Sequence, residues 1–140
     1  MGRVLALDYG TKRTGIAVTD ELQLITSGLT TVNTKDLMDF IQRYLQEETV
    51  DILVVGEPKQ RDGSPSQVEP EIQKFLIRLQ EVLPGLKVVR TDERFTSKMA
   101  FQSMLDGGLK KSQRQNKALI DEISATIILQ AYLENKPITE

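Results

Sequence analysis

The fold is decided by residues 4–18, VLALDYGTKRTGIAV. A short apolar run stops at Asp8, a polar turn follows, and a second apolar run comes after the turn. Two apolar runs joined by a turn that Gly10 and Gly15 bracket predict a β-hairpin. We expect Gly10 either to take a backbone conformation closed to other residues or to let a ligand come close.

Asp8 is the candidate functional residue of this hairpin. An ionised carboxylate at the end of a buried strand is costly without a partner, so it should face a cleft, a cation or a cluster of donors. Lys12 and Arg13 place positive charge beside it. The alternative is an ordinary surface turn, since most aspartates in proteins are exposed.

The composition excludes several kinds of chemistry. A chain of 140 residues is expected to form one domain, residues 1–140, that is large enough for a core. The absence of cysteine excludes disulfides, thiolate catalysis and zinc–thiolate sites, and the absence of histidine removes the usual general base. Any reaction must therefore use carboxylates, hydroxyls, lysine, arginine or a bound metal.

Charge and hydropathy bear on location and partners. No apolar run approaches the roughly 18 residues of a membrane span, and the N-terminus lacks the pattern of a signal peptide. We therefore expect a cytoplasmic protein with no membrane partner. A net charge of −2 does not suit nucleic-acid binding by bulk electrostatics, so such binding would need local patches.

The rest of the chain alternates between strand and helix patterns. A turn is expected at 20–24, a polar exposed loop at 59–70, and a basic mobile segment at 106–117. The apolar stripe of the last helix is expected to comprise Leu119, Ile120, Ile123, Ile127, Ile128 and Ala131. The further strands are expected at 27–32, 51–56 and 86–90, and the helices at 34–48, 72–83, 97–105 and from near 117 to 134.

This order predicts an α/β fold. Three strands joined by hairpin connections come first, and the later strands are separated by helices. Strands joined through a helix are parallel and cross over with a right-handed connection. We therefore expect a mixed five-stranded sheet, with three antiparallel strands followed by two parallel ones, and helices on its faces.

Acidic residues follow three of the predicted strands. Asp8 ends the first strand, Glu57 follows the strand at 51–56, and Asp92 and Glu93 follow the strand at 86–90. In open α/β sheets ligands bind outside the carboxyl ends of the strands. The last helix adds Asp121, which lies beside its apolar stripe.

A cluster of carboxylates is suited to divalent cations. Magnesium prefers oxygen ligands, often one or two carboxylates together with water and substrate phosphate. Two such ions about 4 Å apart can activate water and stabilise the leaving oxygen of a phosphodiester. This chemistry requires neither histidine nor cysteine.

Four motifs lie along nearly the whole chain, in a characteristic order. Together they resemble the YqgF/RuvX family of ribonuclease H-like nucleases, whose members are described as pre-ribosomal-RNA nucleases and as Holliday junction resolvases. The motifs are LDYGTKRTGIAV at 7–18, VVGEP at 54–58 with DGS at 62–64, DERFT at 92–96, and DEISATIILQ at 121–130.

The resemblance implies a ribonuclease H-like fold and an acidic site that holds Mg²⁺ or Mn²⁺. Its catalytic acids would be Asp8, Glu93 and Asp121. Many members carry an apolar residue in place of Glu57, whereas related junction resolvases have a catalytic acid at the end of that strand. Either Glu57 or Glu93, or both, is therefore a candidate for the middle ligand, and Asp92 either binds metal or pairs with a neighbouring base.

The basic residues near the site have two possible roles. They either grip phosphates or balance nearby carboxylates, and a basic loop is either a nucleic-acid clamp or simply solvated. Tyr9 either stacks on a base or forms part of the core. The candidates near the acids are Lys12, Arg13 and Arg94, and those of the loop are Lys110, Lys111, Arg114 and Lys117.

The resemblance implies a metal-dependent hydrolase of phosphodiester bonds. Its substrate would be the precursor of small-subunit ribosomal RNA, trimmed near the 5′ end in ribosome biogenesis, with structured RNA and ribosomal precursor particles as partners. Cleavage of branched DNA is the alternative enzyme function and would require a homodimer rather than a monomer. A non-catalytic nucleic-acid-binding protein and an actin-like ATP-binding module are further alternatives, although 140 residues supply only one domain of the latter.

Overall fold

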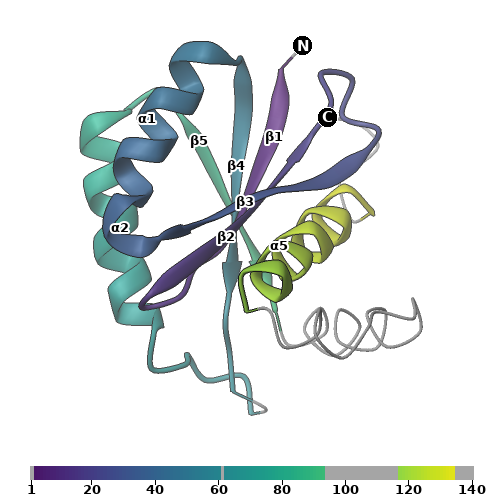
Figure 1. The fold of residues 1–140 in the computed structure, drawn as a ribbon. Coiled ribbons are helices and arrows are strands. Elements are labelled where there is room, and N and C mark those ends of the chain that lie inside the picture. Colours follow the sequence, from purple (N-terminus) through teal and green to yellow (C-terminus); the bar gives the residue numbers. More distant parts are fainter. Residues whose placement is uncertain (1, 61, 94–116, 135–140) are drawn as a thin grey trace.

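The chain forms a five-stranded mixed sheet with helices on both faces (Figure 1). A computed structural model describes residues 2–60, 62–93 and 117–134. The strands are β1 (Arg3–Asp8), β2 (Arg13–Thr19), β3 (Thr26–Asn33), β4 (Val50–Glu57) and β5 (Lys87–Asp92). The helices are the short 3-10 helix η1 (Thr34–Asp36) and the α-helices α1 (Leu37–Glu47), α2 (Glu69–Val82) and α5 (Lys117–Glu134).

The strand order is β3-β2-β1-β4-β5. Strands β1, β2 and β3 pair antiparallel through two hairpins, whereas β4 pairs parallel with β1 and β5 pairs parallel with β4. The predicted mixed sheet is therefore confirmed. Its central strands β1 and β4 are apolar on both faces, as strands covered by helices on both sides are.

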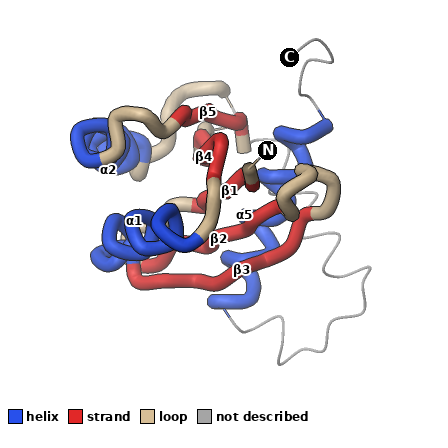
Figure 2. Tube along the Cα trace, turned by 90° about the horizontal axis from the view of Figure 1, so that it is seen from above, coloured by secondary structure: helices blue, strands red, loops and turns tan. Residues whose placement is uncertain are grey.

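Helices α1 and α2 cover one face of the sheet and α5 covers the other (Figure 2). On β1, Leu5 and Leu7 belong to the core under α1 and α2, whereas Val4 and Ala6 belong to the core under α5. Successive side chains of a strand point to opposite faces. Asp8 therefore points to the face that α5 covers.

Helix α5 lies very close to the sheet because glycines face it. A β-carbon at Gly15 of β2 would overlap the main-chain carbonyl group of Asp121, and one at Gly28 of β3 would lie 3.3 Å from the β-carbon of Glu122. The Thr31 hydroxyl donates to the Ala118 carbonyl at 2.6 Å and fixes the start of the helix. These contacts bring Asp121 down to the level of the strand ends.

Several boundaries differ from the sequence-based expectation. Helix α2 begins at Glu69, so the loop expected at 59–70 ends two residues earlier, because a proline in the first helical turn needs no amide hydrogen bond. Strand β5 extends to Asp92 rather than 90, and the helix expected at 34–48 begins as η1 and ends at Glu47. The turn at 20–24 is confirmed, with the Asp20 carboxylate accepting from the Leu24 and Ile25 amides.

The last helix is apolar on every side, and its predicted stripe is wrong in detail. Helix α5 spans the expected range, but Ile128 is the one member of the predicted stripe that is buried, together with Ala125 and Leu129. Apolar residues all round a helix leave no periodic signal for the buried side. The helix expected at 97–105 and nearly all of the basic segment expected at 106–117 lie outside the described residues.

Within the described part of the chain, no helix is long and apolar enough to cross a membrane.

Candidate active site

Three acids from separate parts of the chain converge on the face of the sheet that α5 covers. Asp8 is the last residue of β1, Glu93 follows directly after β5, and Asp121 lies near the start of α5. The carboxyl groups of Asp8 and Glu93 are hydrogen-bonded to each other, and the charge of Asp121 acts on Asp8. The structure therefore brings together three of the five acids that the sequence singled out.

Gly56 makes this convergence possible. Strand β4 separates β1 from β5, so Glu93 has to pass over β4 to reach Asp8. A β-carbon at Gly56 would lie 2.7 Å from the Glu93 carboxyl carbon and 2.8 Å from Ile128 Cδ1, so any side chain there would force these neighbours to shift. The Glu93 amide also donates to the Glu57 carbonyl at 3.1 Å, so the turn after β5 is held against the end of β4.

Burial raises the pKa of both hydrogen-bonded acids, while the hydrogen bond between them lowers the pKa of Asp8 and raises that of Glu93. Loss of solvent is the largest cause for Asp8, whose pKa rises to about 6, with a further increase from the charge of Asp121. Loss of solvent also dominates at Glu93, where the charge of Asp8 helps to raise the pKa to about 9. Two adjacent carboxyl groups cannot both ionise easily, so the pair retains a proton at neutral pH.

Asp121 is held by Arg13 at the start of β2. The Arg13 Nε donates to Asp121 Oδ2 at 3.0 Å, and the two side chains are 38% and 22% exposed. Among residues 2–60, 62–93 and 117–134, no three acids lie in a ready metal-binding arrangement. The oxygen-only donors and the shared proton nevertheless fit a hard divalent cation, whose binding displaces protons from its ligands.

Glu57 and Asp92 lie on the opposite face of the sheet. Val55 of β4 and Val88 of β5 face the core under α1 and α2, and strand alternation places Glu57 and Asp92 on that same face. Both acids bind Lys59, whose Nζ lies 3.3 Å from Glu57 Oε1 and 3.7 Å from Asp92 Oδ2. The structure therefore does not bring these two acids together with Asp8.

A charged pair that the sequence analysis missed supports the end of β4. Arg90 donates to the Val55 and Gly56 carbonyls at 3.2 and 3.0 Å. Its guanidinium group also binds both carboxylate oxygens of the buried Glu69, at 3.0 and 2.8 Å. The signal was an arginine on the core side of an apolar strand, since such a charge requires a buried partner.

The turn that follows Asp8 is tight for a different reason from the one expected. Gly10 does not have a positive φ, since Gly63 is the described glycine that does. A β-carbon at Gly10 would instead overlap the Arg13 carbonyl group. Gly10 is therefore needed because the turn packs against itself.

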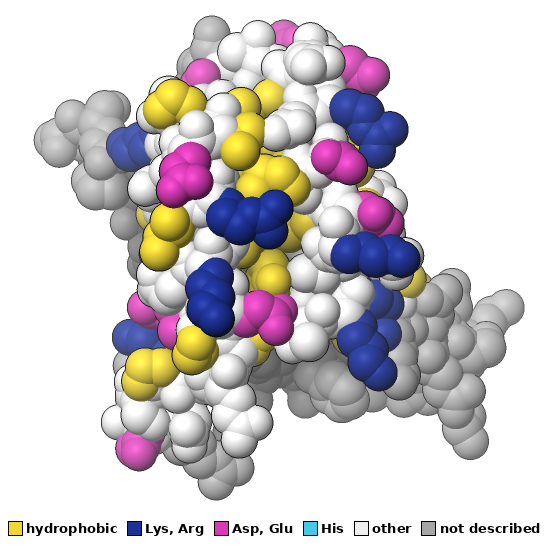
Figure 3. All heavy atoms as spheres, turned by 90° about the vertical axis from the view of Figure 1, so that its left-hand side faces the viewer, with side chains coloured by type: hydrophobic (Ala, Val, Ile, Leu, Met, Phe, Trp, Pro, Cys, Tyr) yellow, Lys and Arg dark blue, Asp and Glu magenta, His cyan; other side chains and the backbone are white. Residues whose placement is uncertain are grey.

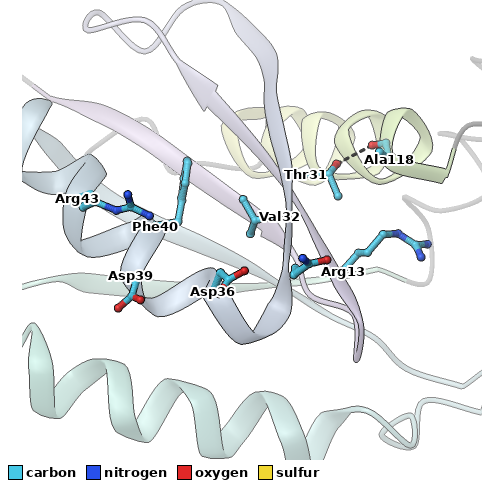
Figure 4. Close-up of a pocket in the computed structure, with 9 residues that line it drawn as sticks. Arg13, Thr31, Val32, Asp36, Asp39, Phe40, Arg43 and Ala118 are labelled. Carbon is cyan, nitrogen blue, oxygen red and sulfur yellow. Dashed lines mark hydrogen bonds between the residues drawn. The ribbon is translucent and has the colours of Figure 1, made fainter.

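A polar hollow of about 430 Å³ lies beside the acidic cluster, between the end of β3, the first turns of α1 and the start of α5 (Figure 4). Arg13 lines it and also binds Asp121, so this arginine connects the hollow to one acid of the cluster. Asn33, Asp36 and Arg43 supply donors and acceptors around it.

The remaining predicted residues fall into three groups. Lys12 is exposed in the turn after Asp8. Tyr9 is buried with its ring 5.6 Å from that of Phe75, on the face away from the acids, which gives it a core role. Lys117 begins α5, and the other predicted basic residues lie outside the described residues: Arg94, Lys110, Lys111 and Arg114.

Curated relatives match the chain over almost its whole length. A protein of Flavobacterium johnsoniae named "Putative pre-16S rRNA nuclease" is 59% identical over 136 residues, covering 97% of this chain and 99% of that protein. A protein of the same name from Christiangramia forsetii is 61% identical over 133 residues, covering 95% and 98%.

The fold is similar to that of a solved protein bound to a Holliday junction. The structure described as T. thermophilus RuvC in complex with Holliday junction substrate matches with a TM-score of 0.58 at 15% identity, covering 97% of each chain. The model of the family described as "RuvX: Holliday junction resolvase" matches residues 2–135. Because that model spans nearly the whole chain and the relatives exceed 50% identity, the chain belongs to the RuvX family.

Proposed function

We propose that this protein is a metal-dependent nuclease that hydrolyses phosphodiester bonds in the precursor of small-subunit ribosomal RNA. One observation carries the proposal: Glu93 crosses β4 over Gly56 to meet Asp8, beside Asp121 on the helix that covers this face. An apolar side chain at position 93 would suit the buried surface better than a carboxyl group. Buried acids that are brought together in this way do not stabilise the fold, so their arrangement indicates a catalytic site.

We assign the metal ligands to Asp8, Glu93 and Asp121, and the metal to Mg²⁺ or Mn²⁺. A divalent cation held there would favour ionised water near neutral pH and stabilise the negative charge that develops on the leaving oxygen. Its binding requires the Asp8–Glu93 pair to release the shared proton. Glu57 and Asp92 are assigned a supporting role through Lys59.

Arg13 is proposed to bind a substrate phosphate close to the cut. Arg13 lines the polar hollow and its Nε binds Asp121, so a phosphate that arrives from the hollow can replace the carboxylate as its partner. Arginine binds carboxylates and phosphates in the same forked geometry. Releasing Asp121 would free that carboxylate for the cation.

The names of the curated relatives support an RNA substrate. The name of the family model supports a second candidate, cleavage of a four-way DNA junction. Symmetric cleavage of a junction needs two sites related by a two-fold axis, and so a dimer. A labelled RNA precursor and a labelled junction separate the two functions.

The test compares cleavage of both substrates by the wild type and by three variants, with Mg²⁺ or Mn²⁺. Asp8→Asn and Glu93→Gln should lower kcat by about 100-fold or more, because each removes a ligand of the reaction centre. Glu57→Gln is the matched control, an acid at the same edge on the other face, and should stay within about threefold of the wild type. Equal cleavage by all four proteins would overturn the proposal, since it indicates a contaminating nuclease.

A further inference from the structure

A second hollow lies between α1 and α2, on the face opposite the acidic cluster. Its volume is about 360 Å³, and we call it the helical groove. Its floor is formed by Tyr9, Phe75 and Met38. The rings of Tyr9 and Phe75 are in contact and largely buried, so the floor is a fixed, mainly apolar surface.

Three cations stand around this floor. Lys35 belongs to η1, while Lys74 and Arg78 are one turn apart on α2, across the groove from it. All three side chains are exposed, and none has an ion pair with another described residue. Figure 3 presents this side of the molecule, where apolar side chains reach the surface among lysine, arginine and acidic side chains.

The acidic residue that lines the groove, Glu71, already has a hydrogen-bond partner. Glu71 is hydrogen-bonded to the Tyr9 hydroxyl, and together with burial this interaction raises the pKa of Tyr9 to about 12. Tyr9 therefore stays neutral at physiological pH. The groove offers three cations against one acid, in a protein whose net charge is −2.

The groove and the acidic cluster are joined by one turn. Asp8 and Tyr9 are adjacent in the chain and point to opposite faces of the sheet. Lys12 is exposed in the turn that follows them. A polyanion that passes over this turn contacts positive charge on both sides of the sheet edge.

We propose that the helical groove binds backbone phosphates of the nucleic-acid substrate, in a part of the substrate that is not cut. Cations around an apolar, aromatic floor suit a chain in which phosphates alternate with sugars and bases. The turn that joins the groove to the acidic cluster favours the substrate over an acidic peptide as the occupant. This inference rests on the proposed function, and it implies a substrate that bends around the sheet edge rather than a straight single strand.

The test is a double charge reversal, Lys74→Glu with Arg78→Glu, compared with Lys87→Glu. Lys87 is exposed at the start of β5, at the other end of the sheet, so it controls for the reversal of a single charge outside the groove. Binding of a labelled ribosomal-RNA precursor fragment is followed by fluorescence anisotropy over a series of salt concentrations. The double variant should raise Kd about tenfold or more and lower the slope of log K against log salt by about one to two.

The kinetic constants for cleavage test the same inference. The double variant should raise KM and leave kcat within about twofold of the wild type, because the groove holds substrate away from the reacting bond. Replacing Lys74 and Arg78 with each other's residue type, which keeps both charges, should restore Kd. If the double variant and Lys87→Glu bind the RNA alike, the inference is overturned.

Two further outcomes separate this inference from its foundation. If the wild type cleaves neither substrate, the proposed function fails. The groove is still tested in that case, because RNA binding can be compared between the Asp8→Asn protein and the same protein with Lys74→Glu and Arg78→Glu added. A mononucleotide is titrated into the same proteins. If the groove changes abolish its binding but leave RNA binding intact, the groove serves a small phosphorylated ligand and the inference fails.

Discussion

Strand β4 separates Glu93 from Asp8, and the carboxyl group of Glu93 lies directly over Gly56. The glycine is needed for space and not for an unusual backbone conformation, since its φ is not positive. Ile128 of α5 closes the same space from above. At the scale of the residue, the acidic cluster therefore depends on a missing side chain.

Gly56→Ala should disturb the site more than the fold. The added methyl group would press on the Glu93 carboxyl group and on Ile128, so one of them must move. We expect kcat to fall by about tenfold or more, with a loss of stability of about 1–3 kcal/mol, typical of overpacking. Gly85→Ala is the control, because nothing lies within 4 Å of a β-carbon there. Equal kcat for the two variants would show that Gly56 does not position Glu93.

The raised pKa of Glu93 predicts how stability depends on pH without metal. The unfolded chain releases this proton near 4.5, whereas the folded protein keeps it until about 9. The free energy of unfolding should therefore fall as the pH rises through this window, by on the order of 1 kcal/mol per pH unit. Glu93→Gln removes the effect, so its Tm should exceed that of the wild type increasingly from pH 5 to pH 9. A constant difference in Tm across this range would contradict the prediction.

At the scale of the element, the sequence predicted the strands well, but it did not predict to which face of the sheet each acid at a strand end points. Apolar runs and hairpin turns indicated five strands in the observed order. Strands β1 and β4 are apolar on both faces, so no alternation in their sequences tells where an acid at their ends points. Leu7 pairs with Val55, so Asp8 is level with Gly56, and Glu57 comes one residue later on the opposite face. That register, which cannot be read from one sequence, separates Glu57 from the cluster.

Arg90 joins two elements, and its loss should destabilise the fold. It binds Glu69 of α2 and the last carbonyl groups of β4 at once. Arg90→Met would leave the buried Glu69 carboxylate without a cationic partner and with only the Gln73 amide among the described residues as a side-chain donor, which costs about 3–5 kcal/mol. Lys87→Met on the same strand is exposed and should cost less than about 0.5 kcal/mol. Chemical denaturation measures both, and similar midpoints would contradict a supporting role for the Arg90–Glu69 pair.

At the scale of the whole molecule, the acidic cluster and the cations of the helical groove lie on opposite faces of the sheet. The α5 face carries the three acids, and the α1–α2 face carries the cations of the helical groove. A net charge of −2 therefore conceals two local regions of opposite sign. Cation binding at the first region would remove the repulsion that the phosphates of a substrate meet there.

A divalent cation should stabilise the folded protein as a whole. A ligand that binds only the folded state raises the free energy of unfolding, by about 2.7 kcal/mol at 100 times its Kd. Adding Mg²⁺ or Mn²⁺ should therefore raise the Tm of the wild type, and a chelator should reverse the increase. Asp8→Asn should show little increase, whereas Glu57→Gln should respond like the wild type. If neither metal changes the Tm of the wild type, the assigned metal site is contradicted.

The ion pair between Arg13 and Asp121 joins residues that are 108 positions apart in the sequence. During synthesis, the first strands leave the ribosome long before the helix that carries Asp121. Contacts between such distant segments form late in folding, because a long loop has to close first. We therefore expect the acidic cluster to be completed late in folding, and a chain that lacks α5 would carry Asp8 without the proposed ligand Asp121.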